Sequence, residues 1–201
     1  MTLASSLALF FALALSAAIP GPSVLAVVSR SLSGGLLQGM LAVVGVIIAD
    51  ILLISLALLG LTTLALLLGE FAIILKYIGA SYLIWMAWKL WHVSPNSDQS
   101  SVEGAGSSVL TGIVMTLSNP KAILFYMGFL PAFVDLSSLT TVDSAIIYVL
   151  SMIAVGGVLT FYAGFASVMR AQLKNSHSSR WLSKLSGGVF ASCGVLLVVK
   201  Q

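Results

Sequence analysis

The stretch Ala18-Ile19-Pro20-Gly21-Pro22-Ser23 interrupts the first long apolar segment of the chain. Each proline removes a backbone donor, and its ring clashes with the carbonyl four residues earlier, so a helix cannot continue straight through. In a membrane the freed carbonyls need partners, and such a break persists only where it is buried in protein or lines a wet cavity. A second motif, Ser118-Asn119-Pro120-Lys121, interrupts a later apolar segment. Paired breaks in corresponding segments are typical of a transporter's binding site.

The composition predicts an all-α integral membrane protein. Of the 201 residues, 59% are hydrophobic and only 7% are charged, whereas about 25% of the residues of a soluble domain are charged. The net charge of +3 is too small to indicate a nucleic-acid partner. The expected surroundings are therefore a lipid bilayer.

Six apolar segments are long enough to cross a hydrocarbon core of about 30 Å as helices. We expect them at about residues 3–28, 36–59, 71–91, 109–134, 144–169 and 185–199. The first has no basic residue before Arg30 and continues to Val28, so we expect a retained span rather than a cleaved signal peptide. Residues 92–108 are polar and predict a cytoplasmic linker between a first three-helix repeat, residues 1–91, and a second, residues 109–201.

Basic residues gather in alternate loops of this arrangement. The loops after the first, third and fifth segments contain Arg30, Lys89, Arg170, Lys174, Arg180 and Lys184. The opposite side contains Lys76 and Lys200, with the acidic loop from Asp135 to Asp143. The positive-inside rule places the basic loops in the cytoplasm and both termini outside. Three spans in each half make the two repeats inverted with respect to each other.

Small residues recur at helical spacing in two of the segments. They are Gly39, Ala42, Gly45 and Ala49 in the second segment, and Gly156, Thr160 and Gly164 in the fifth. Such stripes let a neighbouring membrane helix approach closely. We expect both stripes to be packing faces.

Each break is expected to restart as a helix. Gly21 and Asn119 would be the N-caps, and Pro22 and Pro120 the first helical residues, because asparagine is a favoured cap and proline a favoured first residue. The free N–H groups of the two restarts would be those of Ser23 and Val24, and of Lys121 and Ala122. Helix N-termini bind anions such as carboxylates. Packed kinks without a ligand are the alternative interpretation.

Two charged residues lie at membrane depth. Asp50 is the carboxylate well inside a predicted span, and Lys121 follows the second break by one residue. Charged groups in membrane spans are costly and usually serve function. We therefore consider Asp50 the candidate proton-coupling residue and Lys121 the candidate counter-charge for an anion. The alternative is a structural ion pair between Asp50 and Lys121. We expect no catalytic site, metal site or cofactor. The candidate substrate-binding residues are Pro20, Gly21, Pro22, Ser23, Asp50, Asn119, Pro120 and Lys121.

The chain resembles the LysE/RhtB family of amino-acid exporters over nearly its whole length. The resemblance rests on Pro20-Gly21-Pro22, Gly45, Asp50, Tyr82-Leu83-Ile84-Trp85 with Lys89, and the block from Leu117 to Phe133 that contains Asn119-Pro120-Lys121. It implies a multi-pass protein of a bacterial inner membrane that exports amino acids or close derivatives, driven by the proton gradient.

These residues suggest how a zwitterion would bind. Its carboxylate would meet the restarted helix ends and Lys121, and its ammonium would meet Asp50 and carbonyls freed before each break, such as those of Ala17 and Thr116. Proton binding at Asp50 would then compete with the substrate, which gives antiport. The alternatives are an inorganic-cation or heavy-metal exporter of the same superfamily, and a membrane scaffold or redox protein. The sequence leaves open which amino acid is exported and whether the chain forms a homo-oligomer.

Overall fold

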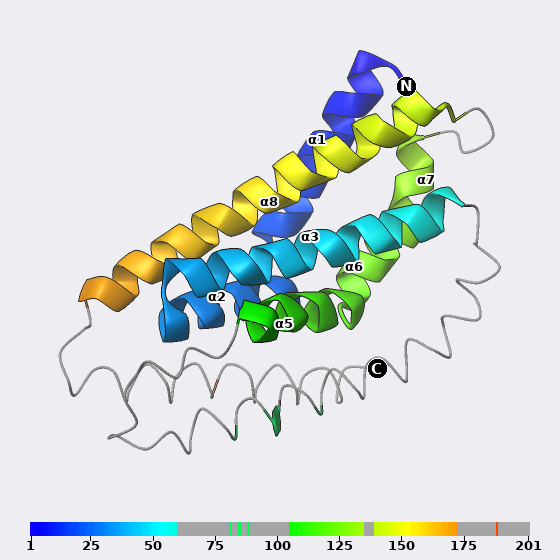
Figure 1. Ribbon diagram of the computed structural model, residues 1–201. Coiled ribbons are helices and arrows are strands. Elements are labelled where there is room, and N and C mark those ends of the chain that lie inside the picture. The colour runs from blue at the N-terminus through cyan, green and yellow to red at the C-terminus, as the bar shows by residue number, and fades with distance from the viewer. Residues whose placement is uncertain are drawn as a thin grey trace.

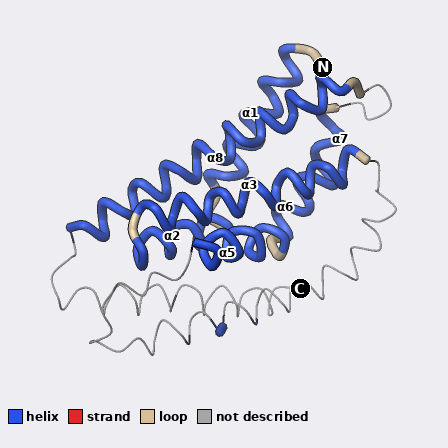
Figure 2. The backbone as a smooth tube through the Cα atoms, in the orientation of Figure 1, coloured by secondary structure: helices blue, strands red, loops and turns tan. Residues whose placement is uncertain are grey.

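The computed structural model describes residues 1–59, 105–134 and 139–172, and residues 81, 84, 85, 88 and 188 singly. Within this part of the chain the structure is helical and contains no strand (Figures 1 and 2). The expected third and sixth spans, and most of the expected linker, fall outside the continuously described ranges. The six-span count, the two repeats and their inversion therefore stay predictions.

The first apolar segment folds as two helices. Helix α1 covers Leu3–Ala18 and helix α2 covers Pro22–Gly34, with a bend of 58° between them. The break predicted at the proline motif is confirmed. The short turn that Arg30 and Gly34-Gly35 indicate is present at Gly35, but Arg30 is not part of it, because α2 continues through this residue to Gly34 and the Arg30 side chain packs inside the protein.

Helix α3, Leu36–Leu58, follows directly and agrees with the second predicted span. Gly35 joins α2 to α3 with a φ of +83°, a conformation that glycine adopts without strain. A Cβ on Gly35 would lie 3.0 Å from the guanidinium of Arg170. This turn and the C-terminal end of the long helix that carries Arg170 are therefore at the same end of the molecule.

The segment after the linker is broken in the same way. Helix α5, Ala105–Leu117, and the helical stretch that begins at Pro120 also meet at a bend of 58°. Because α5 begins at Ala105, the last four residues of the expected linker are helical, which corrects the predicted boundary.

The stretch after the second break changes its helical type. Helix α6, Pro120–Leu124, passes into a π-helical segment η1, Phe125–Phe129, and then into α7, Leu130–Phe133. A π turn thus precedes Pro131, and the chain stays helical through this proline. Local π geometry is one way in which a membrane helix adjusts to the donor that proline lacks.

Helix α8, Thr141–Gln172, is 32 residues long and contains the fifth predicted span. It extends beyond that span at both ends, so Asp143 and Arg170 lie in its first and last turns rather than in loops. In the described part of the chain, α3 and α8 are each long and apolar enough to cross a membrane. The two bent pairs pass the same test as broken spans, which gives two spans, or up to four.

Helix α3 packs against α2, α5 and α8, while α1 packs along α8 (Figure 1). Helices α3 and α5 approach each other closely, because a Cβ on Gly45 would lie 2.0 Å from the carbonyl oxygen of Val109. The first small-residue stripe is thus confirmed as a packing face. The second is wrong beyond Gly156, because Thr160 is exposed and a Cβ on Gly164 would meet no described atom within 4 Å.

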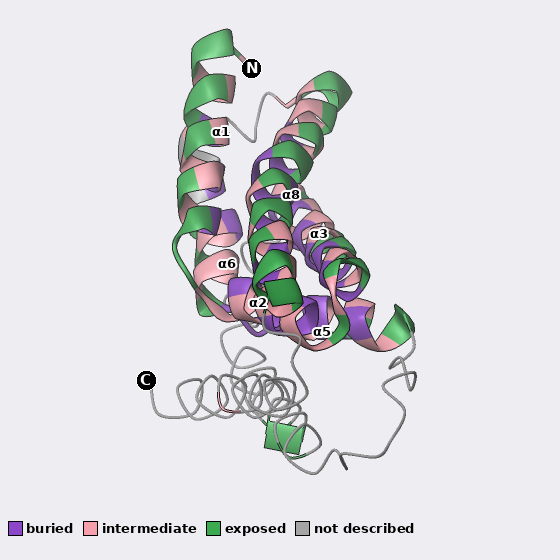
Figure 3. Ribbon diagram, turned by 90° about the vertical axis from the view of Figure 1, so that its left-hand side faces the viewer, coloured by how far each residue is buried: buried purple, intermediate pink, exposed green. Residues whose placement is uncertain are grey.

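The outer faces of these helices carry large apolar side chains, and several polar groups are inside. Figure 3 shows which parts of each helix are buried and which are exposed. Phe11, Phe161 and Phe165 are exposed, with 72% of Phe161 accessible. In contrast, Arg30 and Asp50 are each only 4% exposed. An apolar exterior around buried charges fits a hydrocarbon environment, where polar groups must find partners inside the protein.

Candidate functional site

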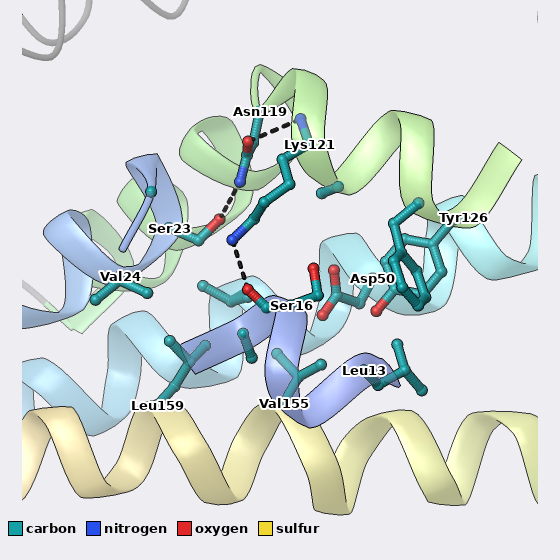
Figure 4. A pocket seen from close by; sticks show the side chains of 15 residues that line it. Leu13, Ser16, Ser23, Val24, Asp50, Asn119, Lys121, Tyr126, Val155 and Leu159 are labelled. Atoms are coloured by element: carbon teal, nitrogen blue, oxygen red, sulfur yellow. Dashed lines mark hydrogen bonds between the residues drawn. The ribbon is translucent and has the colours of Figure 1, made fainter. Parts of the chain in front are cut away.

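The two breaks lie side by side and are joined by hydrogen bonds. The amide nitrogen of Asn119 donates to the hydroxyl of Ser23 at 3.2 Å, and that hydroxyl shares a hydrogen bond of 3.1 Å with the hydroxyl of Thr116 (Figure 4). Ser23 lies in the first turn of α2, and Asn119 begins α6. Residues almost a hundred positions apart thus meet at one crossing point.

The predicted restarts have the expected geometry. Gly21 is the N-cap of α2 in extended conformation, and Pro22 is the first helical residue. Asn119 is the N-cap of α6, its side-chain oxygen accepts the N–H of Lys121 at 3.1 Å, and Pro120 is the first helical residue. Both caps are therefore confirmed by the structure. The expectation of a free N–H at Lys121 is wrong, because the Asn119 cap accepts it.

The ammonium of Lys121 reaches back across the break to the end of α1. It donates to the carbonyl oxygens of Ser16 at 2.6 Å and Ile19 at 2.8 Å. A cation is favourable there, because the last carbonyls of a helix lack partners and carry partial negative charge. In the described part of the chain no ion pair joins Lys121 to Asp50, so the alternative of a direct pair is wrong for this conformation.

Other groups hydrogen-bond to two further carbonyls near the breaks. The hydroxyl of Tyr162 donates to the carbonyl of Ala18 at 2.8 Å. The carbonyl of Thr116, expected to be free for a substrate, accepts the backbone N–H of Asn119 at 3.1 Å. This expectation is corrected, because the turn at the second break closes with its own backbone bond.

Asp50 approaches the crossing point from α3. Asp50 and Tyr126, which comes from η1, both line the cavity described below (Figure 4). The hydroxyl of Tyr126 shares a hydrogen bond of 2.9 Å with the hydroxyl of Ser151 on α8. Asp50, Tyr126 and Ser151 thus come from three different elements.

A small cavity of about 50 Å³ lies between Asp50 and Lys121. Its polar lining consists of Ser16, Ser23, Asp50, Asn119, Lys121 and Tyr126. Its apolar lining consists of Leu13, Ala17, Val24, Val46, Ala122, Phe125, Val155 and Leu159, with Gly21 at the break. This volume has room for a few water molecules at most, since one water needs about 10–15 Å³ of such space. The cavity is therefore too small for an amino acid in this conformation.

The cavity contains five of the eight predicted site residues. These are Gly21, Ser23, Asp50, Asn119 and Lys121. Pro20, Pro22 and Pro120 do not line the cavity; the last two start the helices beside it. The sequence did not identify two residues of the lining, Ser16 and Tyr126. Ser16 binds Lys121 only through its backbone carbonyl. A tyrosine inside an apolar run was the available signal, because a buried tyrosine hydroxyl usually has a partner.

A second polar cluster lies around the buried Arg30 of α2. Its guanidinium donates to the hydroxyl of Thr111 at 2.7 Å and to the hydroxyl of Ser107 at 2.9 Å, both on α5. On the same helix, Ser108 hydrogen-bonds to Gln38 of α3. These contacts tie α5 to α2 and α3, beside the close crossing at Gly45.

The comparisons with known proteins agree with this architecture. The chain is 38% identical to an uncharacterized membrane protein of Synechocystis sp., over 97% of this chain and 96% of that protein. It is 38% identical to a leucine efflux protein of Enterobacter sp. over 64% of this chain and 63% of that protein, and 32% identical to one of Klebsiella pneumoniae over 61% and 59%. These two matches thus span less than two thirds of the leucine efflux proteins, and no solved structure matches the chain.

The family comparison covers the chain more completely. Residues 13–201 match the family described as LysE type translocator. This range contains both proline breaks, Asp50 and the cavity between the helices. The chain is therefore a membrane protein of a transporter family, and it belongs to the LysE type translocators.

Proposed function

We propose that this protein exports amino acids with apolar side chains, or close derivatives of them, from the cytoplasm. The observation that carries this proposal is the cavity at the crossing of the two breaks, which has a carboxylate on one side and an ammonium on the other. An amino acid is a zwitterion and needs a group of each sign. The apolar part of the lining suits an aliphatic side chain, and the names of the leucine efflux relatives support the same class.

The substrate's carboxylate would bind Lys121 and the first N–H groups of α2, those of Ser23 and Val24. An N-terminus of a 13-residue helix favours an anion, and the ammonium adds a full charge. The substrate's own ammonium would bind Asp50. In this arrangement the substrate's carboxylate pairs with the ammonium of Lys121, and the substrate's ammonium pairs with the carboxylate of Asp50, at a site from which water is largely excluded.

The small cavity must expand before it can hold an amino acid. Ligand pockets are usually larger than about 300 Å³, and the present cavity is about 50 Å³. The two breaks would allow the cavity to expand, because each lets one half of a span move against the other half. We expect substrate entry to separate Lys121 from the carbonyls of Ser16 and Ile19, and the cavity to open to each side of the membrane in turn.

Proton antiport would follow from competition at Asp50. A protonated carboxyl no longer attracts an ammonium, so a proton that enters from outside would release the substrate there. Loss of that proton to the cytoplasm would restore the site for the next substrate. The location that fits this cycle is a bacterial inner membrane, with both termini outside.

The test is efflux from proteoliposomes that contain the purified protein. The vesicles are preloaded with labelled leucine, lysine or Mn²⁺, and loss of each is compared with loss from protein-free vesicles. We expect leucine to leave faster than from protein-free vesicles, and lysine and Mn²⁺ to leave at the protein-free rate. Leucine retained as in protein-free vesicles would contradict amino-acid export, and selective loss of Mn²⁺ would favour the cation exporter instead.

A further inference from the structure

Helix α8 gives the cavity a wall that is entirely apolar. Among the described residues of the lining, α8 supplies Val155 and Leu159 and no polar group. Helices α1, α2, α3 and α6 and the π segment η1 each supply at least one polar side chain. In Figure 4, Val155 and Leu159 lie on the α8 side of the cavity, across from Asn119 and Lys121. A substrate whose charged groups bind Lys121 and Asp50 therefore has α8 as the surface for an apolar side chain.

Contacts with neighbouring elements fix the orientation of this wall. Ser151, Val155 and Leu159 follow one another at four-residue spacing, which places them on one face of α8. The hydroxyl of Ser151 shares a hydrogen bond of 2.9 Å with the hydroxyl of Tyr126 on η1. A Cβ on Gly156 would lie 3.2 Å from the Cδ1 of Ile47, so α8 also packs closely on α3. The wall cannot move away from the cavity without loss of these contacts.

The wall also stays in place when the cavity expands. In the proposed function the cavity expands at the two breaks, which lie between α1 and α2 and between α5 and α6. Helix α8 instead continues through 32 residues without a break. The residues that α8 presents to the cavity therefore limit the room for the side chain of a substrate.

Val155 is the stiffer and the more accessible of the two wall residues. Its side chain branches at Cβ, and in a helix such a side chain has one strongly preferred χ1 rotamer, whereas the branch of Leu159 lies one bond further out. Val155 is 9% exposed and Leu159 only 1%. A substrate's side chain thus meets methyl groups at Val155 that cannot swing aside.

We propose that Val155 is the specificity-determining residue of this site. Its side chain sets the size limit, so that aliphatic side chains up to that of leucine are accepted and the rings of aromatic amino acids are excluded. One methylene group more or less in an apolar pocket changes the preference between two substrates by about 10–200-fold. The inference rests on the proposed function and narrows its class of substrates.

The test compares the efflux of three amino acids from proteoliposomes. Vesicles that contain the wild type or a variant are preloaded with labelled alanine, leucine or phenylalanine. Val155→Ala enlarges the space at the wall, and Val155→Leu reduces it. The matched controls are Val158→Ala and Val158→Leu, because Val158 also lies on α8 and packs against the core but does not line the cavity. The readout is the ratio of two efflux rates, since damage to the fold alone lowers all rates together.

We expect the wild type to export leucine faster than phenylalanine. Val155→Ala should raise the ratio of phenylalanine to leucine efflux by about tenfold or more, and Val155→Leu should raise the ratio of alanine to leucine efflux. Both ratios should stay at the wild-type value in the Val158 variants. Equal export of leucine and phenylalanine by the wild type, an unchanged ratio in Val155→Ala, or the same change in Val158→Ala would overturn the inference.

The remaining outcomes separate this inference from the proposed function. If Val155→Ala does not fold, an unchanged ratio of alanine to leucine efflux in Val155→Leu overturns the inference. Wild-type vesicles that retain all three amino acids as protein-free vesicles do would refute the proposed function, and the inference with it. Leucine efflux by the wild type with ratios that no Val155 variant changes would overturn the inference alone.

Discussion

Replacement of Gly112 by alanine tests the helix crossing that places Asp50. A Cβ at this position would lie 2.1 Å from the carbonyl oxygen of Ala42 and 2.8 Å from the backbone nitrogen of Val46. Both atoms belong to the backbone of α3, so no side-chain rotation can relieve the overlap. Ordinary contact begins at 3.4 Å, and α3 and α5 must therefore separate by about 1.3 Å.

The size of the effect follows from this overlap. An overpacked core residue typically costs about 1–3 kcal/mol. For a chain of this length each kcal/mol lowers the melting temperature by about 2–4 °C, so we expect a decrease of about 2–12 °C. Asp50 lies one turn beyond Val46 on α3, and a shift of this helix changes the distance from its carboxylate to Lys121. Leucine efflux should therefore fall as well.

The assay combines thermal unfolding of the purified protein with efflux from proteoliposomes. The control is Gly157→Ala on α8, where a Cβ meets no described atom within 4 Å. Alanine is favoured over glycine in a helix by up to about 1 kcal/mol, so the control should be at least as stable as wild type. Wild-type melting and efflux in Gly112→Ala, or equal losses in both variants, would refute the reasoning.

Three further predictions follow from the polar contacts and the charge pattern. Lys121→Met removes two hydrogen bonds to the end of α1, each worth about 1.5–3 kcal/mol with a charged donor. The melting temperature and the rate of leucine efflux should therefore fall more than in Lys121→Arg. Wild-type values of both in Lys121→Met would contradict this. Arg30→Met should be less stable than Arg30→Lys, because it leaves the hydroxyl of Ser107 without a cationic donor; equal melting temperatures would show that the cluster contributes nothing. Cysteines placed at Ser97 or Ser178 in a cysteine-free background should react with an impermeant reagent only after the membrane is opened; labelling in intact cells would reverse the predicted orientation.

Local chemistry determines the features that the sequence predicted well. The caps at Gly21 and Asn119 depend on the residues at the breaks themselves, because proline cannot continue a helix and asparagine bonds its own backbone. Gly45 was identified from spacing alone, and its contact with α5 requires nothing more than a missing Cβ. The membrane-protein class follows from composition.

Tertiary contacts explain what the sequence did not predict. Arg30 was placed in a loop because charged residues usually end spans, yet hydroxyls of α5 stabilise it inside the protein. Lys121 was paired with an anion, but the nearest partners are carbonyls of a helix about a hundred residues earlier. The π segment Phe125–Phe129 has no local signature, so the position of Tyr126 in the cavity lining could not be derived from spacing.

The most direct test of the account is the Asp50→Asn variant. Asparagine has nearly the shape of aspartate but cannot bind or release a proton at neutral pH. The measurement is leucine efflux from preloaded proteoliposomes, with and without an imposed pH gradient, for wild type, Asp50→Asn and the double variant Asp50→Asn, Lys121→Met.

The account predicts that the gradient accelerates efflux by the wild type. Asp50→Asn should reach the membrane and melt as the wild type does, yet lose this acceleration, and the double variant should not regain it. Recovery in the double variant would assign Asp50 to structure, because removing both charges avoids leaving one buried without its counter-charge. Full gradient-driven efflux by Asp50→Asn alone would contradict the central claim that this carboxylate couples protons to export.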